Sequence, residues 1–229
     1  SHPARSSPPP PPPLPPPTAE VVVVEVGTNA PGEIARLAGI VEPDAAVITA
    51  VGAGHLEGLG SVAGVLEEKV SLLRALPPEG VAIVAEEPPE LVARARELAP
   101  RLRVAGWGER ADAVLRAESI RLDEEGFASF AWQGRAVRLN YRGRHNVRNA
   151  LLALGVGVEW GIDAEAAVAA LAVVAPEKLR SEVRRIGAIT VIADCYNSNP
   201  ESLAAAVDLL EAMPRRGGRV AVVGSMLEL

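Results

Sequence analysis

The chain has 229 residues, 48% hydrophobic side chains and a formal net charge of −6, which is the composition of a globular protein with a sizeable core. Its arginines are scattered among acidic residues instead of forming a basic stripe, so nucleic acid is not an expected partner. One cysteine, Cys195, excludes a disulfide within the chain, and no apolar run approaches the roughly 20 residues that cross a bilayer. We therefore expect a cytoplasmic protein with no membrane insertion.

The first segment, residues 1–19, is rich in proline, with runs at 8–13 and 15–17. Proline has no backbone N–H and favours the polyproline II conformation, so this segment cannot pair within a sheet. We interpret it as a linker or surface loop. The alternative is a proline-rich ligand for an SH3-type domain.

Residues 20–110 alternate β-branched or apolar runs with helical patterns. Apolar runs predict buried parallel strands at residues 20–26, 45–51, 81–85 and 103–105. A short helix is expected to end at residue 38, and two longer helices to cover residues 62–76 and 89–99. Alternating strands and helices favour a mostly parallel sheet with right-handed connections.

The pattern changes after residue 110. Residues 114–122, 127–132 and 136–141 read as antiparallel strands, followed by helices at 144–160 and 164–174. A new β-α-β pattern then occupies residues 189–194, 200–212 and 219–224. The predicted fold class is α/β: a mostly parallel sheet with a small antiparallel subsheet, then the start of a Rossmann-like unit. We divide the chain into a linker (1–19), a central domain (20–177) and an incomplete second domain (178–229).

Lys69 has an unusual position on the helix at 62–76. It falls on the same stripe as the apolar residues Val65, Leu66 and Leu73, and Lys69 and Lys178 are the only lysines of the chain. A lysine retained where arginine is otherwise used suggests a task for a neutral amine. The alternative is that its stem covers apolar surface while the ammonium reaches solvent.

Six segments in order resemble the Mur ligases, most closely their branch that adds D-alanyl-D-alanine. They are Glu25-Val-Gly-Thr-Asn-Ala-Pro-Gly-Glu-Ile34, residues 47–61 with Lys69, and residues 143–149, 179–183, 194–200 and 222–229. The resemblance implies a ligase in which ATP phosphorylates the carboxylate of UDP-MurNAc-tripeptide and the amine of D-Ala-D-Ala attacks the acyl phosphate. We expect such an enzyme to be a monomer and to act by positioning and by stabilising negative charge.

The resemblance also implies two Mg²⁺ ions. Glu25 would hold one that bridges the ATP phosphates, and His55 would bind a second together with a carbamate formed on Lys69 by CO₂. Burial favours the unprotonated amine that carbamylation needs. Taken alone, Glu25 could be an ordinary strand-end carboxylate and His55 an ordinary loop histidine.

By the same resemblance, Asn149 would contact adenine, because an amide both donates and accepts, while Asn146 would bind the nucleotide or cap the helix. Arg180 would contact the γ-phosphate, or else form an ion pair with Glu182 or Glu177. His145 and Arg148 could face solvent.

A polar turn follows the strand expected at 189–194. The resemblance implies that it approaches the nucleotide, whereas turn and N-cap chemistry is the plainer interpretation. Its candidate residues are Asp194, Tyr196, Asn197 and Asn199.

The match also has departures. No Gly-x-x-Gly-Lys-Thr phosphate-binding loop occurs in these residues, so we expect this chain alone to be inactive toward ATP. Ala50, Gly54, Ala193 and Ser225 differ from the residues the family often has, which puts fine substrate contacts in doubt. The alternatives are another Mur-type, folylpolyglutamate-type or cyanophycin-type amide ligase, or a non-catalytic module that keeps the fold.

Overall fold

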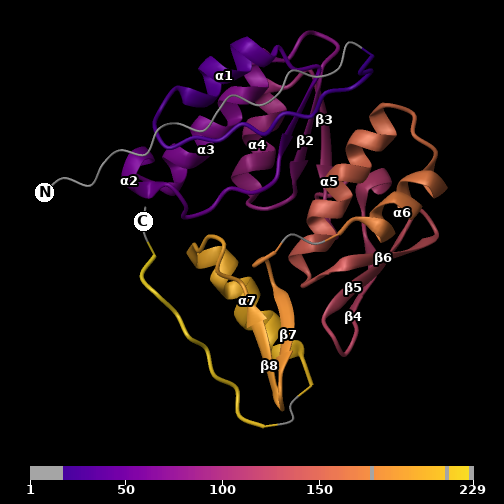
Figure 1. Cartoon of the computed structure of the whole chain (residues 1–229). Coiled ribbons are helices and arrows are strands. Elements are labelled where there is room, and N and C mark those ends of the chain that lie inside the picture. The colour runs from indigo at the N-terminus through magenta and orange to yellow at the C-terminus, as the bar shows by residue number, and fades with distance from the viewer. Residues whose placement is uncertain (1–17, 176–177, 215–216, 227–229) are drawn as a thin grey trace, which may run out of the picture.

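The computed structural model describes residues 18–175, 178–214 and 217–226, so the proline runs and part of the expected junction at 177–178 lie outside the described residues. We call residues 33–173 the body and residues 178–226 the second part (Figure 1). No helix in the described ranges combines the length and the apolar content needed to cross a membrane.

A three-stranded parallel sheet forms the centre of the body. Its strands are β1 (Ala45–Ile48), β2 (Val81–Ala85) and β3 (Arg101–Ala105), in the order β1-β2-β3. Alternate residues of β2 serve two cores: Val81 and Ile83 face one, and Ala82 and Val84 the other. This two-sided burial explains why β2 is an unbroken apolar run and confirms the predicted parallel α/β sheet.

Helices cover both faces of this sheet (Figure 1). The core that contains Ala82 and Val84 is closed by residues of α3 (Val62–Val70), the 3₁₀ turn η1 (Ser71–Ala75) and α4 (Pro89–Leu98). α1 (Glu33–Val41) lies against α3 and η1, and the one-turn helix α2 (Leu56–Leu59) precedes α3. α5 (His145–Glu159) covers the opposite face and contacts α6 (Ala164–Val173).

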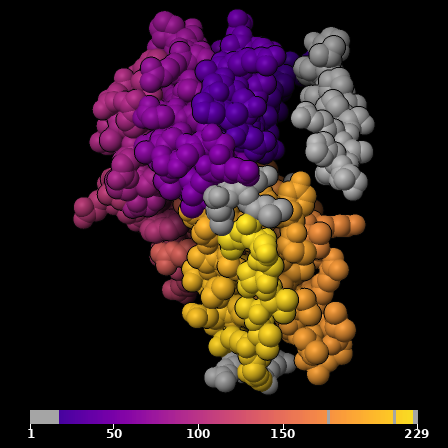
Figure 2. Space-filling model, turned by 90° about the vertical axis from the view of Figure 1, so that its left-hand side faces the viewer, coloured from indigo at the N-terminus to yellow at the C-terminus, as the bar shows by residue number. Residues whose placement is uncertain are grey.

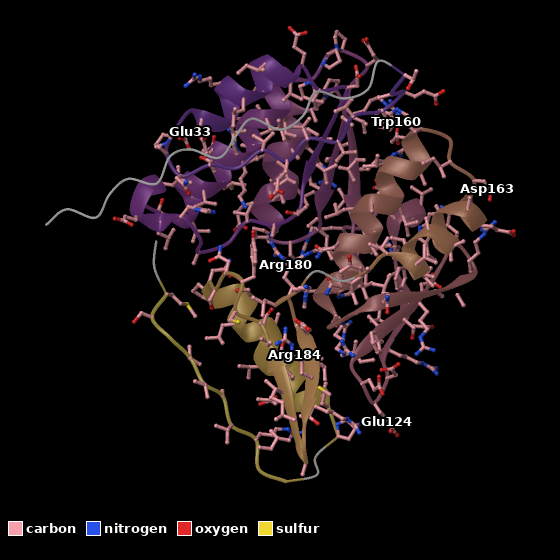
Figure 3. The ribbon with its side chains drawn as sticks, viewed as in Figure 1. Glu33, Glu124, Trp160, Asp163, Arg180 and Arg184 are labelled. Carbon is pink, nitrogen blue, oxygen red and sulfur yellow. The ribbon has the colours of Figure 1, made fainter. Side chains whose placement is uncertain are left out.

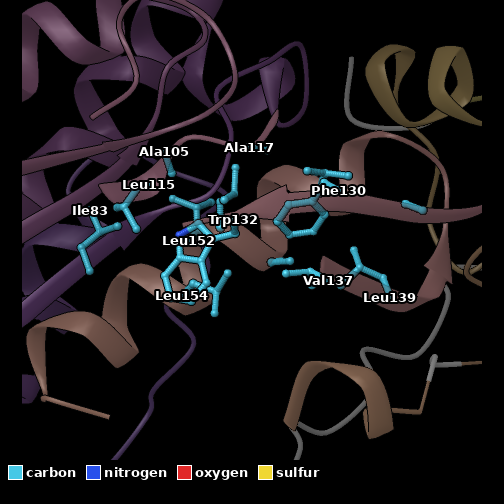
Figure 4. Close-up of a cluster of buried hydrophobic side chains, with 14 of the residues drawn as sticks. Ile83, Ala105, Leu115, Ala117, Phe130, Trp132, Val137, Leu139, Leu152 and Leu154 are labelled. Atoms are coloured by element: carbon cyan, nitrogen blue, oxygen red, sulfur yellow. The ribbon is translucent and has the colours of Figure 1, made fainter. Parts of the chain in front are cut away.

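The other face of α5 packs on a three-stranded antiparallel sheet. The short 3₁₀ turn η2 (Ala113–Leu115) leads into β4 (Glu118–Leu122), β5 (Phe127–Trp132) and β6 (Arg135–Arg142). Figure 4 shows the shared core, which contains Phe130 and Trp132 of β5 together with Leu152 and Leu154 of α5. The indole Nε1 of Trp132 donates to the carbonyl oxygen of Val114 at 2.8 Å, which satisfies the polar atom of a buried ring. The expected antiparallel subsheet is confirmed.

The second part contains a two-stranded antiparallel sheet, β7 (Glu182–Ile186) and β8 (Ile189–Ala193), and the helix α7 (Pro200–Ala212). Leu209 of α7 is 1% exposed and packs against Gly126, where an added Cβ would lie 2.4 Å from its Cδ1. Leu209 therefore anchors α7 on the turn between β4 and β5. Figure 2 shows residues 217–226 on the outer surface of the second part.

Two predicted strands are wrong. Residues 20–26 and 219–224 form no strand, and Val23 and Val222 are 89% and 95% exposed. Both runs have the β-branched composition of a strand, but a strand forms only where a neighbouring edge pairs with its N–H and C=O groups. Among the described residues, β1 pairs only with β2, and β8 pairs only with β7.

Candidate functional site

Lys69 lies near the end of α3 and is half-buried. Its Nζ donates a hydrogen bond to the carbonyl oxygen of Ala50, 2.8 Å away, in the loop after β1. Burial lowers the pKa of Lys69, and the negative charge of Glu201 acts in the opposite direction. The helical spacing thus placed Lys69 correctly on the covered side of the helix, where its amine is tied to the loop that leads to His55.

His55 follows the Gly52–Gly54 turn and starts α2. It has a left-handed backbone with φ of 63°, is half-buried, and its carbonyl oxygen accepts from the N–H of Leu59 at 3.0 Å. Because Lys69 binds Ala50 in the same loop, the candidate amine and the candidate imidazole belong to one locally connected structure.

Glu25 is not where the sequence placed it. Its residue is exposed in a segment without regular structure, because the strand expected at residues 20–26 does not form. Within the described ranges, no group of three or more His, Cys, Asp or Glu side chains could hold a metal ion. The expected set of Glu25, His55 and a carbamylated Lys69 contains only two such side chains, so it stays a prediction.

Sequence reasoning missed Glu68, which is 7% exposed. Its carboxylate accepts from the backbone N–H groups of Gly32 and Ile34, both at 2.8 Å, and from the hydroxyl of Thr28 at 3.3 Å. A carboxylate at the N-terminus of α1 satisfies donors that the helix leaves free and interacts favourably with its dipole. Glu68 follows Val65 by three residues, so helical spacing would have placed it on the buried side.

The start of α5 carries the candidate adenine contacts. The side-chain amide of Asn146 donates to the carbonyl oxygen of Arg142 at 2.8 Å, and Asn149 donates to the Asn146 side-chain oxygen at 3.0 Å. Asn146 therefore orients Asn149, whose residue is exposed. Burial lowers the pKa of His145, the positive charge of Arg148 lowers it further, and Asp194 raises it.

Arg148 is half-buried rather than solvent-facing, and burial lowers its pKa against the effect of Glu87. It lines a cavity of about 160 Å³ at the carboxyl ends of β2 and β3, together with Glu86 and Trp107. Glu86, which sequence reasoning also missed, accepts from the N–H groups of Trp107 and Gly108 at 2.7 and 2.8 Å. This buried carboxylate therefore fixes the loop after β3.

In the second part, Arg180 lies at the end closest to the body, and Arg184 lies farther along β7 (Figure 3). The Arg180 guanidinium stacks on the ring of Tyr196, 4.5 Å from the ring centroid. Asp194 accepts from the N–H of Ser181 at 2.8 Å. The turns at 179–181 and 194–196 are thus held together. The alternative partner Glu177 lies outside the described residues, and Glu182 is bound by Arg184 at 2.8 Å.

The two parts share a cavity of about 200 Å³. The body contributes Tyr141, Arg142 and Asn146, and the second part contributes Lys178 and Arg180. The lining also holds the amide of Asn140 and the carboxylate of Glu182, which Arg184 binds. Two amides and three cationic side chains suit a ligand that combines hydrogen-bonding groups with negative charge. The cavity therefore brings together two candidate residues that are distant in sequence, Asn146 and Arg180.

Asn197 and Asn199 make local contacts. The Asn199 side chain accepts from the N–H of Ser202 at 2.8 Å, and the Ser202 hydroxyl accepts from the N–H of Asn199 at 2.9 Å, which is a capping box. The Asn197 side-chain oxygen accepts from the N–H of Ser198. Their structural roles are therefore a turn and an N-cap, and contact with a nucleotide stays a prediction.

Comparisons with known proteins identify the family of both parts of the chain. Residues 14–157 match the family model described as the Mur ligase middle domain, and residues 179–229 match the model described as Mur ligase, glutamate ligase domain. The UDP-N-acetylmuramoyl-tripeptide--D-alanyl-D-alanine ligase of Bacillus subtilis is 33% identical over 92% of the chain and 45% of that protein. The Escherichia coli enzyme of the same name is 33% identical over 92% of the chain and 47% of that protein.

Two solved structures that resemble this chain belong to the same family. MurF from Acinetobacter baumannii superposes with a TM-score of 0.73 and 30% identity, covering 82% of the chain and 42% of that structure. MurF from Thermotoga maritima in complex with ADP has a TM-score of 0.71 at 23% identity, covering 81% and 43%, which is a likeness of fold. The chain spans less than half the length of these relatives.

Proposed function

This chain belongs to the Mur ligase family, and we propose that it is part of an ATP-dependent ligase that joins D-Ala-D-Ala to UDP-MurNAc-tripeptide. The observation that carries the proposal is the 33% identity to curated D-alanyl-D-alanine ligases over 92% of the chain. We propose a cytoplasmic monomer, with residues 1–19 as linker, 20–177 as central domain and 178–229 as part of a second ligase domain.

We propose that ATP binds where the two parts meet. The cavity between Asn146 and Arg180 supports this position, and the ADP complex of the Thermotoga maritima relative supports the choice of an adenine nucleotide. Asn149 would hydrogen-bond the adenine edge with Asn146 holding it in place, and Arg180 would contact the γ-phosphate. Asp194, Tyr196, Asn197 and Asn199 would line the same side of the nucleotide, with Tyr196 orienting Arg180 by stacking.

We propose that Lys69 carries a carbamate. The lowered pKa caused by its burial leaves more of the amine unprotonated, so that it adds to CO₂ and releases a proton. The product is a carboxylate on a long arm, which an arginine cannot form.

The resulting donors fit an oxygen-preferring cation. Glu25 would supply a hard oxygen ligand to one Mg²⁺, and the Lys69 carbamate an oxygen and His55 a nitrogen to a second. Mg²⁺ bound there would neutralise charge on phosphate oxygens. The position of Lys69 beside the loop of His55 supports the assignment of the second ion, and the ion of Glu25 requires that residue to move from its exposed place toward the nucleotide.

The decisive experiment is a product assay on the protein that carries this sequence. With ATP, Mg²⁺ and UDP-MurNAc-tripeptide, D-Ala-D-Ala should give the pentapeptide product by mass spectrometry, with one ADP formed per product. Single amino acids in place of D-Ala-D-Ala should give none. Product from a single amino acid, and none from D-Ala-D-Ala, would assign the chain to another amide ligase.

A matched pair of variants tests Lys69. Lys69→Arg keeps the positive charge but cannot form the carbamate, so turnover should fall about 100-fold or more. Arg74→Lys, on the exposed side of η1, should leave turnover unchanged.

A further inference from the structure

The first turn of α7 reaches the loop that carries His55. The Glu201 carboxylate accepts a hydrogen bond from the backbone N–H of Ala53 at 2.7 Å, and these residues are 148 positions apart in sequence. The contact therefore joins the second part to the body at a point two residues before His55.

Gly52 makes this contact sterically possible. A Cβ atom added at Gly52 would lie 2.6 Å from the carboxyl carbon of Glu201, which is closer than such atoms approach in proteins. Any side chain at this position would push the carboxylate away from Ala53. The glycine beside Ala53 is therefore favoured by this tertiary contact.

The carboxylate is presented from a rigid helix start. Asn199 and Ser202 form the capping box of α7, and Pro200 occupies the first helical position. Glu201 follows directly, so its backbone is held on both sides and only its side-chain torsions remain to be set. Holding the carboxylate at Ala53 therefore costs side-chain entropy but no further ordering of the backbone.

The loop that receives Glu201 also receives Lys69. Ala50 accepts the hydrogen bond of the Lys69 amine, and Glu201 interacts electrostatically with that amine. One carboxylate of the second part thus contacts the backbone that lies between the candidate amine and the candidate imidazole.

From these contacts we infer that Glu201 is a positioning residue: by holding Ala53 it sets the loop of His55 relative to Lys69, and so couples docking of the second part to the divalent-cation site. The inference rests on the proposed function, which supplies the cation. Glu201 itself touches neither the cation nor the substrate in this role; it acts through the loop.

Hydrogen exchange tests the contact itself. The Ala53 amide should exchange slowly in the wild type and at least 10-fold faster in Glu201→Ala, while Glu201→Gln should stay protected because its amide oxygen still accepts. Gly52→Ala should expose Ala53 in the same way by displacing the carboxylate. Asp208→Ala, at an exposed position of the same helix, serves as control and should change nothing. Equal exchange of Ala53 in the wild type and in Glu201→Ala would overturn the inference.

Mn²⁺ binding, measured by electron paramagnetic resonance in bicarbonate buffer, tests the consequence. Glu201→Ala should weaken Mn²⁺ affinity about 5- to 10-fold, and Glu201→Gln should restore most of it. Equal affinity in the wild type and Glu201→Ala would overturn the positioning role and leave the proposed function standing. If the wild type bound no Mn²⁺, the proposed cation site would fail and the positioning role with it.

Discussion

The body and the second part are built in different ways. The body has two apolar cores on the two faces of a parallel sheet, whereas Leu209 is the only fully buried large apolar side chain in the described residues of the second part. The second part is attached by a few specific contacts, chiefly Leu209 on Gly126 and Glu201 on Ala53. The body therefore provides stability, and the second part adds polar groups to a site that the body holds only in part.

This difference divides the candidate site between a well-packed part and a lightly attached part. Asn146 and Lys69 belong to helices that are packed into the cores of the body, while Arg180 and Glu201 stand on the lightly attached second part. A site divided in this way depends on docking, because regions with few buried apolar contacts open at low free-energy cost. Four experiments compare the packing of the body with the attachment of the second part.

The largest effect is expected in the body. Leu151 of α5 is 0% exposed in the core beneath the parallel sheet, so Leu151→Ala should lower the free energy of unfolding by about 2–5 kcal/mol. Ile40→Ala, at a position that is 70% exposed, should change it by less than about 0.5 kcal/mol. Urea unfolding measures both, and a small loss for Leu151→Ala would contradict the assignment of the core.

Leu209→Ala should act mainly on the second part. The lost contact with Gly126 should cost about 2 kcal/mol locally, because the site can partly collapse. Hydrogen exchange should speed up in residues 182–193 and 200–212 and stay unchanged in residues 81–85. Leu210→Ala, at the half-buried neighbouring position, is the matched control. Uniform acceleration throughout the chain would show that the two parts unfold together.

Glu68→Ala should cost about 1–3 kcal/mol, because it leaves the N–H groups of Gly32 and Ile34 without their acceptor. Glu68→Gln keeps one acceptor oxygen and should lose less. Glu67→Ala, which removes an exposed pair with Arg94, is the control and should lose under about 1 kcal/mol. Thermal unfolding of the three variants tests this order.

The smallest effect concerns the pH dependence of His145. Burial lowers its pKa below the ordinary value of about 6.5, so the unfolded chain binds the proton more readily than the folded chain. Stability should therefore fall as the pH drops below about 6.5 and recover above it. His145→Gln should show a shallower decline between pH 7 and 5 than the wild type. An NMR titration that gave His145 a pKa above 6.5 would contradict the expected direction of this pH dependence.

Much of the fold could be predicted from sequence. The strands Val81–Ala85 and Phe127–Trp132 and the helix Pro200–Ala212 have the bounds that apolar periodicity, turn residues and the Asn199 cap predict. The predictions of strands at residues 20–26 and 219–224 fail because a strand needs a neighbouring strand edge to pair with. Composition does not show whether such an edge is present. β7 was missed, since its sequence Glu-Val-Arg-Arg-Ile is too polar for the buried-strand pattern and its residues are half-buried or exposed.

The candidate site could be predicted only where helical spacing or family motifs indicate it. Spacing placed Lys69 on the covered face of its helix, and motifs selected Asn146 and Arg180, which line one cavity. The contacts of Glu68 with Gly32 and of Glu201 with Ala53 join residues 36 and 148 positions apart, so no local pattern signals them. These contacts follow from tertiary packing.

Hydrogen exchange with and without saturating ADP and Mg²⁺, on the protein that carries this sequence, tests most directly whether the two parts form one nucleotide site. We predict that the nucleotide slows exchange simultaneously in residues 145–149 of the body and in residues 179–199 of the second part. Calorimetry in the same buffer establishes saturation. Protection confined to one of the two regions, with ADP bound, would contradict the account.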